Sequence, residues 1–209
     1  MTKPRLAAAD LQAFAAASRA ISPISDVALV AAERALTVTL LPRGGAFLRA
    51  GEHASLIGTV VSGFLRELYV LANGTERTKA FVFEGNATGS LADLLSSEPS
   101  RADIVAEEAT RLVCLPYAVY RDLRQNHVDW ARCHLAVVEA LFIHKARREH
   151  ELLGLDALGR YQALLHRLPT IEQRVSAKHL ASYLGITPVH LSRLRRLRTA
   201  SRRGAEAPR

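Results

Sequence analysis

Cysteine is scarce in this sequence, which limits the sites that thiols could build. Of 209 residues only Cys114 and Cys133 are cysteines, and no Cys-x-x-Cys pair is present. Two thiols cannot supply a disulfide framework or the four ligands of an iron–sulfur cluster within one chain. We therefore expect no iron–sulfur cluster and two buried, reduced thiols, as in a cytoplasmic protein.

Long apolar segments are also missing. No apolar run approaches the roughly 18 residues that a membrane-spanning helix needs. The alanine-rich start of the chain includes Asp10 and lacks a continuous apolar segment, so a signal peptide is not expected. These absences predict a cytoplasmic location and no membrane partner.

The common patterns of enzyme sites are absent too. The sequence contains no Gly-x-Ser-x-Gly, no P-loop and no recognisable Ser-His-Asp arrangement. The region of predicted strands contains one histidine, His53, whereas a metal site there would need clustered histidines with a carboxylate. His144 and His150 share a predicted helix, but their spacing is poor for one metal ion. We predict no catalytic residues, no metal site and no enzymatic activity.

Acidic residues are outnumbered, and the imbalance is local. The chain has 28 Lys and Arg against 20 Asp and Glu, a net charge of +8. Residues 1–150 contain 17 basic and 16 acidic side chains, whereas residues 151–209 contain 11 and 4. This asymmetry is typical of a neutral domain joined to a nucleic-acid or membrane-surface domain, although a basic surface can also serve solubility alone.

Hydrophobic periodicity predicts an α+β protein. Between Leu36 and Leu115, short apolar or alternating segments are separated by turns, which is typical of a β-sandwich or barrel. Asn73-Gly74 lies between two of these segments and predicts a hairpin with a type I′ turn. Helices are expected at Ala7–Arg19 and Val27–Arg34, and from Pro116 onward.

A long helix is expected from Val128 to about Leu152. Apolar residues at steps of four, three and four form a seam like that of a coiled coil, consisting of Ala131, Leu135, Val138 and Phe142. The seam could pack on the sheet of its own chain, but a helix of about 25 residues is roughly 37 Å long and exceeds a small sandwich. We therefore predict that the seam pairs with a second copy, and that Gly154 is a hinge.

The segment from Ala177 to Arg196 has the pattern of a helix-turn-helix. Ala181 leaves room for a second helix, and Gly185 suits the left-handed turn between the two. Thr187 and Pro188 suit the N-cap and the first position of the second helix. The polar and basic residues on the remaining face of that helix favour contact with DNA. This face carries Val189, His190, Ser192, Arg193 and Arg196. The shared core would contain Leu180, Leu184, Ile186, Leu191 and Leu194.

With these elements, the chain resembles the CRP/FNR superfamily of bacterial transcription regulators over about residues 27–198. The most specific stretches are Arg174–Arg193, Pro42–Glu52, Val60–Gly63 and Phe83–Leu91.

The resemblance implies three domains and a tail. Residues 1–127 would form a jelly-roll-like β-roll of the cyclic-nucleotide-binding type, 128–153 a dimerisation helix, and 154–198 a helix-turn-helix DNA-binding domain. The wing that follows the recognition helix in the family has no strand pattern here, so it is expected to be reduced or absent. Residues 199–209 are expected as a disordered basic tail.

The resemblance also implies an effector site in the β-roll. The family's phosphate-binding cassette corresponds to Gly89–Ala102, in which Ser90 replaces the glutamate that holds the ribose 2′-hydroxyl. The expected ligand is a cyclic nucleotide or another small anionic effector, because an arginine remains to hold an anion. The candidate residues are Gly89, Ser90, Leu91, Ser100, Arg101 and Ala102.

For DNA, the resemblance places Arg193 and Ser192 at contact positions, with Arg193 expected on a guanine edge. Phosphate contacts are expected from other basic residues. The full set of expected DNA-binding residues is Lys178, Thr187, His190, Ser192, Arg193, Arg195, Arg196 and Arg198. The expected partners are a palindromic double-stranded operator, a second copy of the chain, and RNA polymerase. The alternative is a ligand sensor or scaffold whose C-terminal helices bind a protein rather than DNA.

Overall fold

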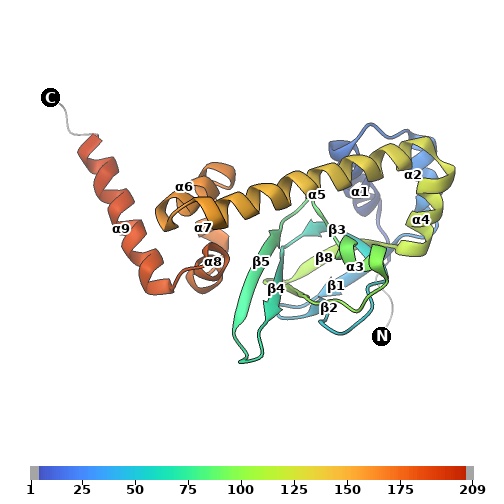
Figure 1. Cartoon of the computed structure of the whole chain (residues 1–209). Coiled ribbons are helices and arrows are strands. Elements are labelled where there is room, and N and C mark those ends of the chain that lie inside the picture. Colours follow the sequence, from blue (N-terminus) through green and yellow to red (C-terminus); the bar gives the residue numbers. More distant parts are fainter. Residues whose placement is uncertain (1–4, 206–209) are drawn as a thin grey trace.

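The computed structural model describes residues 5–205, with side chains as far as residue 198. Figure 1 shows one long helix, α5, running from a β-roll and its flanking helices to a group of helices at the other end, from which α9 projects. The helices are α1 Ala8–Ile21, α2 Asp26–Glu33, α3 Leu91–Ser96, α4 Tyr117–Asn126, α5 Val128–Gly154, α6 Ala157–Arg167, α7 Ile171–Arg174, α8 Ala177–Leu184 and α9 Pro188–Ala205.

The predicted sandwich is confirmed as two four-stranded antiparallel sheets, in the orders β1-β8-β3-β6 and β2-β7-β4-β5. Side chains that alternate inward from both sheets, such as Val60, Leu65, Ile104 and Leu112, form the core between them. The strands are β1 Thr37–Leu41, β2 Ala46–Leu48, β3 Leu56–Ser62, β4 Leu65–Val70, β5 Glu76–Val82, β6 Ala87–Thr88, β7 Asp103–Ala106 and β8 Thr110–Pro116.

The hairpin between β4 and β5 is confirmed, but its turn type was predicted wrongly. Gly74 has φ +76°, whereas Asn73 is not among the residues with positive φ. Gly74 N donates to Leu71 O, and Leu71 N donates to Thr75 O. The loop is therefore a three-residue turn ending in a left-handed glycine, which twists the strands as well as a type I′ turn would.

A second core lies outside the β-roll, where α1, α2 and α4 meet the start of α5. Trp130 packs against Phe14 and Tyr120, and its Nε1 donates to Ala28 O at 2.8 Å. The buried Asp10 accepts two hydrogen bonds of 2.7 Å from Arg111 of β8, and these lower the pKa of its carboxyl group. This ion pair fixes α1 to the sheet.

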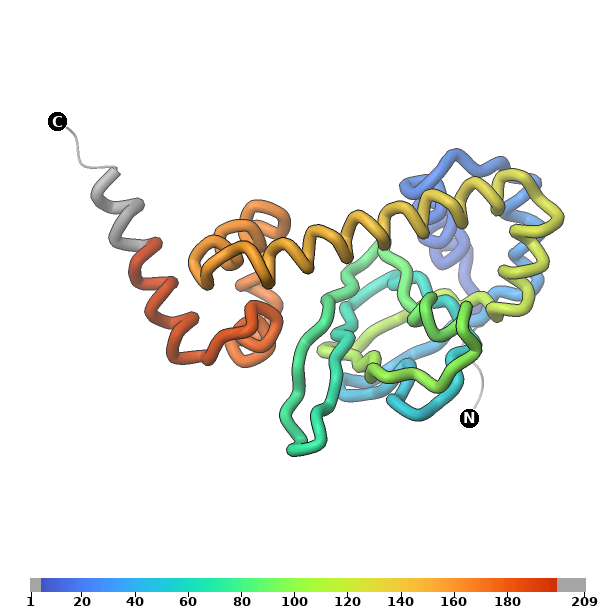
Figure 2. The backbone as a smooth tube through the Cα atoms, viewed as in Figure 1, coloured from blue at the N-terminus to red at the C-terminus, as the bar shows by residue number. Residues whose placement is uncertain are grey.

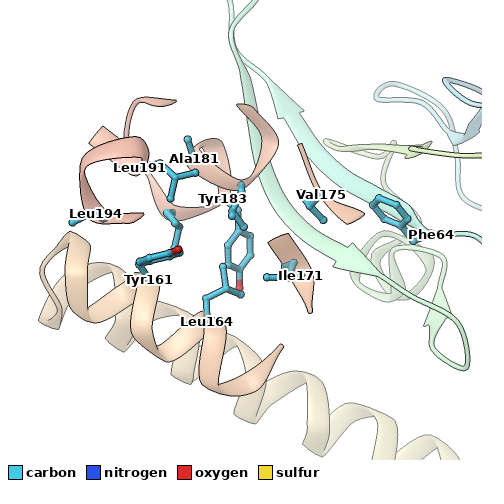
Figure 3. Close-up of a cluster of buried hydrophobic side chains, with 11 residues drawn as sticks. Phe64, Tyr161, Leu164, Ile171, Val175, Ala181, Tyr183, Leu191 and Leu194 are labelled. Atoms are coloured by element: carbon cyan, nitrogen blue, oxygen red, sulfur yellow. The ribbon is translucent and has the colours of Figure 1, made fainter. Parts of the chain in front are cut away.

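A third core joins α6, α7, α8 and α9, with Tyr161, Leu164 and Leu191 at its centre (Figure 3). Phe64 of the β-roll belongs to the same cluster, so the C-terminal helices pack against the sheet region. Figure 2 shows the β4–β5 hairpin beside them.

The C-terminal end of the chain differs from the expected tail. Helix α9 continues to Ala205, because leucine, arginine and alanine favour helix and no proline or turn residue intervenes before Gly204. The last four residues of the expected tail, 206–209, lie outside the described residues. Within the described part of the chain no strand follows β8, so the structure contains no wing there.

Candidate functional site

The helix-turn-helix forms as its sequence predicts. Gly185 has φ +71° and lies between α8 and α9, and Ile186 N donates to Ala181 O at 3.0 Å. Thr187 Oγ1 accepts the backbone N–H of His190 at 3.2 Å, so Thr187 caps α9. Ala181 is fully buried at the contact between the helices. The tight turn at Gly185 and the cap at Thr187 both lie at the start of α9, and together they fix the angle at which α9 is presented.

One face of α9 is exposed and mostly polar, although Val189 and Leu197 of this helix are exposed as well. His190, Ser192, Arg193 and Arg196 all lie on it, whereas Leu191 and Leu194 face the core. Lys178 of α8 is exposed as well. This face combines hydrogen-bonding and cationic side chains on one helix, which suits a DNA groove.

Two of the expected phosphate contacts hold α9 to its own domain. Arg195 Nε lies 2.6 Å from Glu172 Oε1, and Arg198 Nη2 lies 2.8 Å from Glu172 Oε2. Tyr161 also donates to Glu172, at 2.7 Å. Burial raises the pKa of Glu172, but the bonds from Tyr161 and Arg195 outweigh burial, so the net shift is downward. Glu172 was not predicted as a site residue, since neither spacing nor motif indicates it.

The β-roll holds the helix-turn-helix in a defined orientation. Ser182 Oγ accepts from Thr78 N at 2.9 Å and donates to Glu76 O, which ties α8 to β5. Arg174 pairs with Glu84 at 2.7 Å and with Glu108 at 2.5 Å.

His179 adds a further contact, with its Nδ1 2.9 Å from Glu107 Oε2. Burial and the charge of Arg66 lower the pKa of His179 despite the opposing effect of Glu107. The helix-turn-helix is therefore not a freely tethered unit in this structure.

The predicted seam on α5 is exposed in the single chain. Leu135 is 57% exposed and Phe142 is 73% exposed, and Ala131 and Val138 are exposed too. A neighbouring stripe on the same helix, made of Trp130, Cys133, Val137 and Leu141, turns toward a cavity in the chain itself. The two stripes are displaced from each other by one or two residues, so they lie on different faces of α5 and the helix can serve both at once.

Only three of the six expected effector residues line the cavity that lies beside α5. Gly89, Ser90 and Leu91 line the cavity. Ser100 and Ala102 are buried, and Ser100 Oγ donates to Ala102 O at 2.9 Å. Arg101 is exposed and is not part of the cavity lining.

The glycine of this segment is required by packing. Gly89 has φ +139°, and a Cβ there would lie 2.6 Å from Leu56 O. A glycine shared with the cassette pattern is thus explained by the close approach of two backbones.

The cavity has a volume of about 210 Å³ and lies between α1, the sheet and α5. Its lining is mostly apolar and includes Phe14 and Trp130. The charged lining residues are Glu67, Lys79 and Lys145, with Lys79 Nζ 2.8 Å from Glu67 Oε2.

Among residues 5–205, no helix combines the length and apolar character that crossing a membrane requires. No curated protein sequence matches this chain. Residues 38–127 match the cyclic nucleotide-binding domain family.

Solved structures extend the likeness beyond that domain. FixK2 from Bradyrhizobium japonicum matches with a TM-score of 0.69 and 20% identity, over 79% of this chain and 86% of its own. CLP, a c-di-GMP responsive global regulator from Xanthomonas campestris, matches with a TM-score of 0.67 and 18% identity, over 88% and 96%. A putative transcriptional regulator of the CRP/FNR family from Eubacterium rectale matches with a TM-score of 0.65 and 18% identity, over 87% and 88%. Residues 38–127 therefore resemble the cyclic nucleotide-binding domain family, and the chain has the fold of the CRP/FNR regulators over most of its length.

Proposed function

We propose that this protein is a homodimeric, DNA-binding transcription regulator that acts in the cytoplasm. The observation that carries the proposal is the exposed, largely polar and basic face of α9, presented by a capped helix-turn-helix whose opposite face is buried. Arg193 is the residue we assign to base reading, and Arg196 and Lys178 to phosphate contacts. Arg195 and Arg198 act first through Glu172, by holding α9 at its angle.

The dimer follows from the exposed seam of α5. A two-fold axis along Ala131, Leu135, Val138 and Phe142 would bring the same apolar surface of each copy together, as a symmetric interface requires. Two copies of α9 could then enter successive major grooves of a palindromic operator, about one helical turn apart. In this arrangement residues 1–127 are the sensor, 128–153 the dimerisation helix and 154–198 the DNA-binding domain, and RNA polymerase is a further expected partner.

A mobility-shift assay with a pool of randomised DNA duplexes tests the proposal. We expect selection rounds to enrich a palindromic sequence, and binding to weaken steeply as salt rises, because phosphate contacts release counterions. Failure to bind any duplex even at low salt would contradict DNA binding. In that case the alternative function would apply, in which the C-terminal helices bind a protein partner rather than DNA.

Replacing Arg193 with alanine tests the base-reading assignment. We expect the variant to bind the enriched operator about 5- to 150-fold more weakly, which corresponds to about 1–3 kcal/mol, and to lose preference at one base pair. Arg196→Ala should instead weaken binding to all sequences alike and reduce the salt dependence. Arg43→Ala, an exposed arginine on the β-roll, is the matched control and should change neither. A uniform loss for Arg193→Ala would reassign it to the phosphates.

A further inference from the structure

The cavity beside α5 lacks the groups that a cyclic phosphate needs. Among the described residues no arginine lines it, and the exposed Arg101 lies outside the lining. A phosphate in a protein site is commonly held by a bidentate arginine or a cluster of cations. Here Lys79 is already paired with Glu67, and Lys145 is exposed on α5. The half-buried Lys79 is therefore the cation of the enclosed lining, and one ligand carboxylate could pair with it in place of Glu67.

The size and surface of the cavity suit an apolar body. An apolar cavity of about 150 Å³ accepts a benzene ring. At about 210 Å³, this cavity has room for one ring or a medium-length alkyl chain together with a small polar group. Phe14, Trp130, Val137 and Leu141 offer apolar contact from two helices. Burial of such a ligand would be favoured by the hydrophobic effect.

One buried hydroxyl in the cavity lining has no partner among the described residues. Thr88 is 6% exposed and lines the cavity, and its Oγ1 makes no hydrogen bond there. A buried hydroxyl without a partner is unfavourable, so a ligand oxygen that accepts from it would gain affinity. Thr88 thus marks a polar point in an otherwise mostly apolar lining.

We propose that this cavity binds a small apolar carboxylic acid, with its ring or chain between α1, the sheet and α5, and its carboxylate near Lys79 and the hydroxyl of Thr88. The inference deepens the proposed function, on which its regulatory meaning rests, because it names the ligand class of the sensor domain. Binding itself does not depend on DNA. A carboxylate that pairs with Lys79 would compete with Glu67, so the ligand would change the contacts of β4 and β5, the hairpin that holds α8.

Trp130 provides the readout, since it is the single tryptophan of the chain and lines the cavity. The full-length protein is titrated with octanoate and with 3-phenylpropionate while tryptophan fluorescence is recorded. The matched neutral probe is 1-octanol, and cyclic AMP is the competing ligand class. We expect saturable binding of the acids, at least about tenfold tighter than the alcohol, because a charge-assisted contact is lost with the carboxylate. Cyclic AMP should give no saturable change in the same concentration range.

Two variants locate the carboxylate. Thr88→Val keeps the shape of the side chain and removes the hydroxyl, and it should weaken the acids more than 1-octanol, because a carboxylate is the stronger hydrogen-bond acceptor. Lys79→Met should remove the preference for acid over alcohol, whereas Lys145→Met should retain it. Circular dichroism establishes that each variant is folded, and if Lys79→Met fails to fold, Thr88→Val still decides.

Three results would overturn the proposal: equal affinity for acid and alcohol, tighter binding of cyclic AMP, or no response to any acid. If the protein binds the acids but binds no DNA, the result supports this inference and contradicts only the proposed function.

Discussion

A variant with Leu135→Asp and Phe142→Asp is expected to be monomeric and to bind a palindromic operator about 10²- to 10⁴-fold more weakly, since linked half-sites gain that much from simultaneous binding. Both side chains are more than half exposed on α5 and apolar. Placing two carboxylates at a two-fold seam sets like charges against each other in a surface that would be removed from water. Light scattering gives the mass of the particle, and mobility shift gives the affinity.

The control for this variant lies on another helix. Val27 and Val30 of α2 are 76% and 62% exposed, so Val27→Asp with Val30→Asp adds the same charge at equally exposed apolar positions. This control should stay dimeric and keep its affinity for the operator. A double seam variant that remains dimeric would show that α5 is not the interface. A monomeric seam variant with unchanged operator affinity would show that pairing does not contribute to DNA binding.

Replacing Glu151 with alanine is expected to lower the free energy of unfolding by about 3 kcal/mol, as breaking a buried ion pair typically does. Glu151 is 4% exposed near the end of α5, 2.6 Å from Arg167 Nη1 of α6 and 3.4 Å from Arg148 Nη1. Its removal leaves two guanidinium groups without their carboxylate. One of them, Arg148, also donates to Tyr183 O and lies 4.1 Å from the centre of the Tyr183 ring.

Differential scanning calorimetry measures the effect. For a chain of this length we expect the melting temperature to fall by about 6–12 °C, at roughly 2–4 °C per kcal/mol. Glu149→Ala, at an exposed position on the same helix, is the matched control and should change the melting temperature little. Equal melting temperatures for the two variants would show that Glu151 does not brace the joint between α5 and α6.

The stability difference should also depend on pH in a defined direction. Burial raises the pKa of Glu151, but the hydrogen bond and charge of Arg167 and the charge of Arg148 lower it by more, so the net shift is downward. A carboxyl whose pKa is lower in the folded state contributes stability above its unfolded pKa and loses that contribution as pH falls through the folded pKa. The gap between wild type and Glu151→Ala should therefore be full at neutral pH and shrink below about pH 4.

Local signals explain why much of the fold was predictable. The turn at Gly185, the cap at Thr187 and the small Ala181 each depend on neighbours within a few residues, so the helix-turn-helix could be read from one segment. The exposed seam on α5 follows from the period of a single helix. The short β6 and the helices α3 and α7 were not predicted individually, since two to six residues are too few to show a period.

Long-range packing explains why the rest of the candidate site could not be predicted from the sequence. Glu172 pairs with Arg195 and Arg198, which follow it by 23 and 26 residues in the sequence. These contacts exist only once the helix-turn-helix between them has formed. The cavity is lined by α1, α4, α5 and five separate parts of the β-roll, and no local pattern links them. The β-roll contributes residues from β3, β4, β5, β8 and the segment of β6 and α3. Arg101 matches the cassette pattern in sequence, yet its side chain is exposed because the cassette loop turns it away from the cavity.

The shared use of α5 has a consequence for any measurement on this protein in dilute solution. One stripe of the helix lines the cavity and the next carries the exposed seam. If a bound ligand strengthens pairing by some factor, thermodynamic reciprocity requires that the pair bind the ligand more tightly than the single chain by the same factor. The affinity measured for a ligand would then rise with protein concentration, so a titration of nanomolar protein and one of micromolar protein would report different constants for the same cavity.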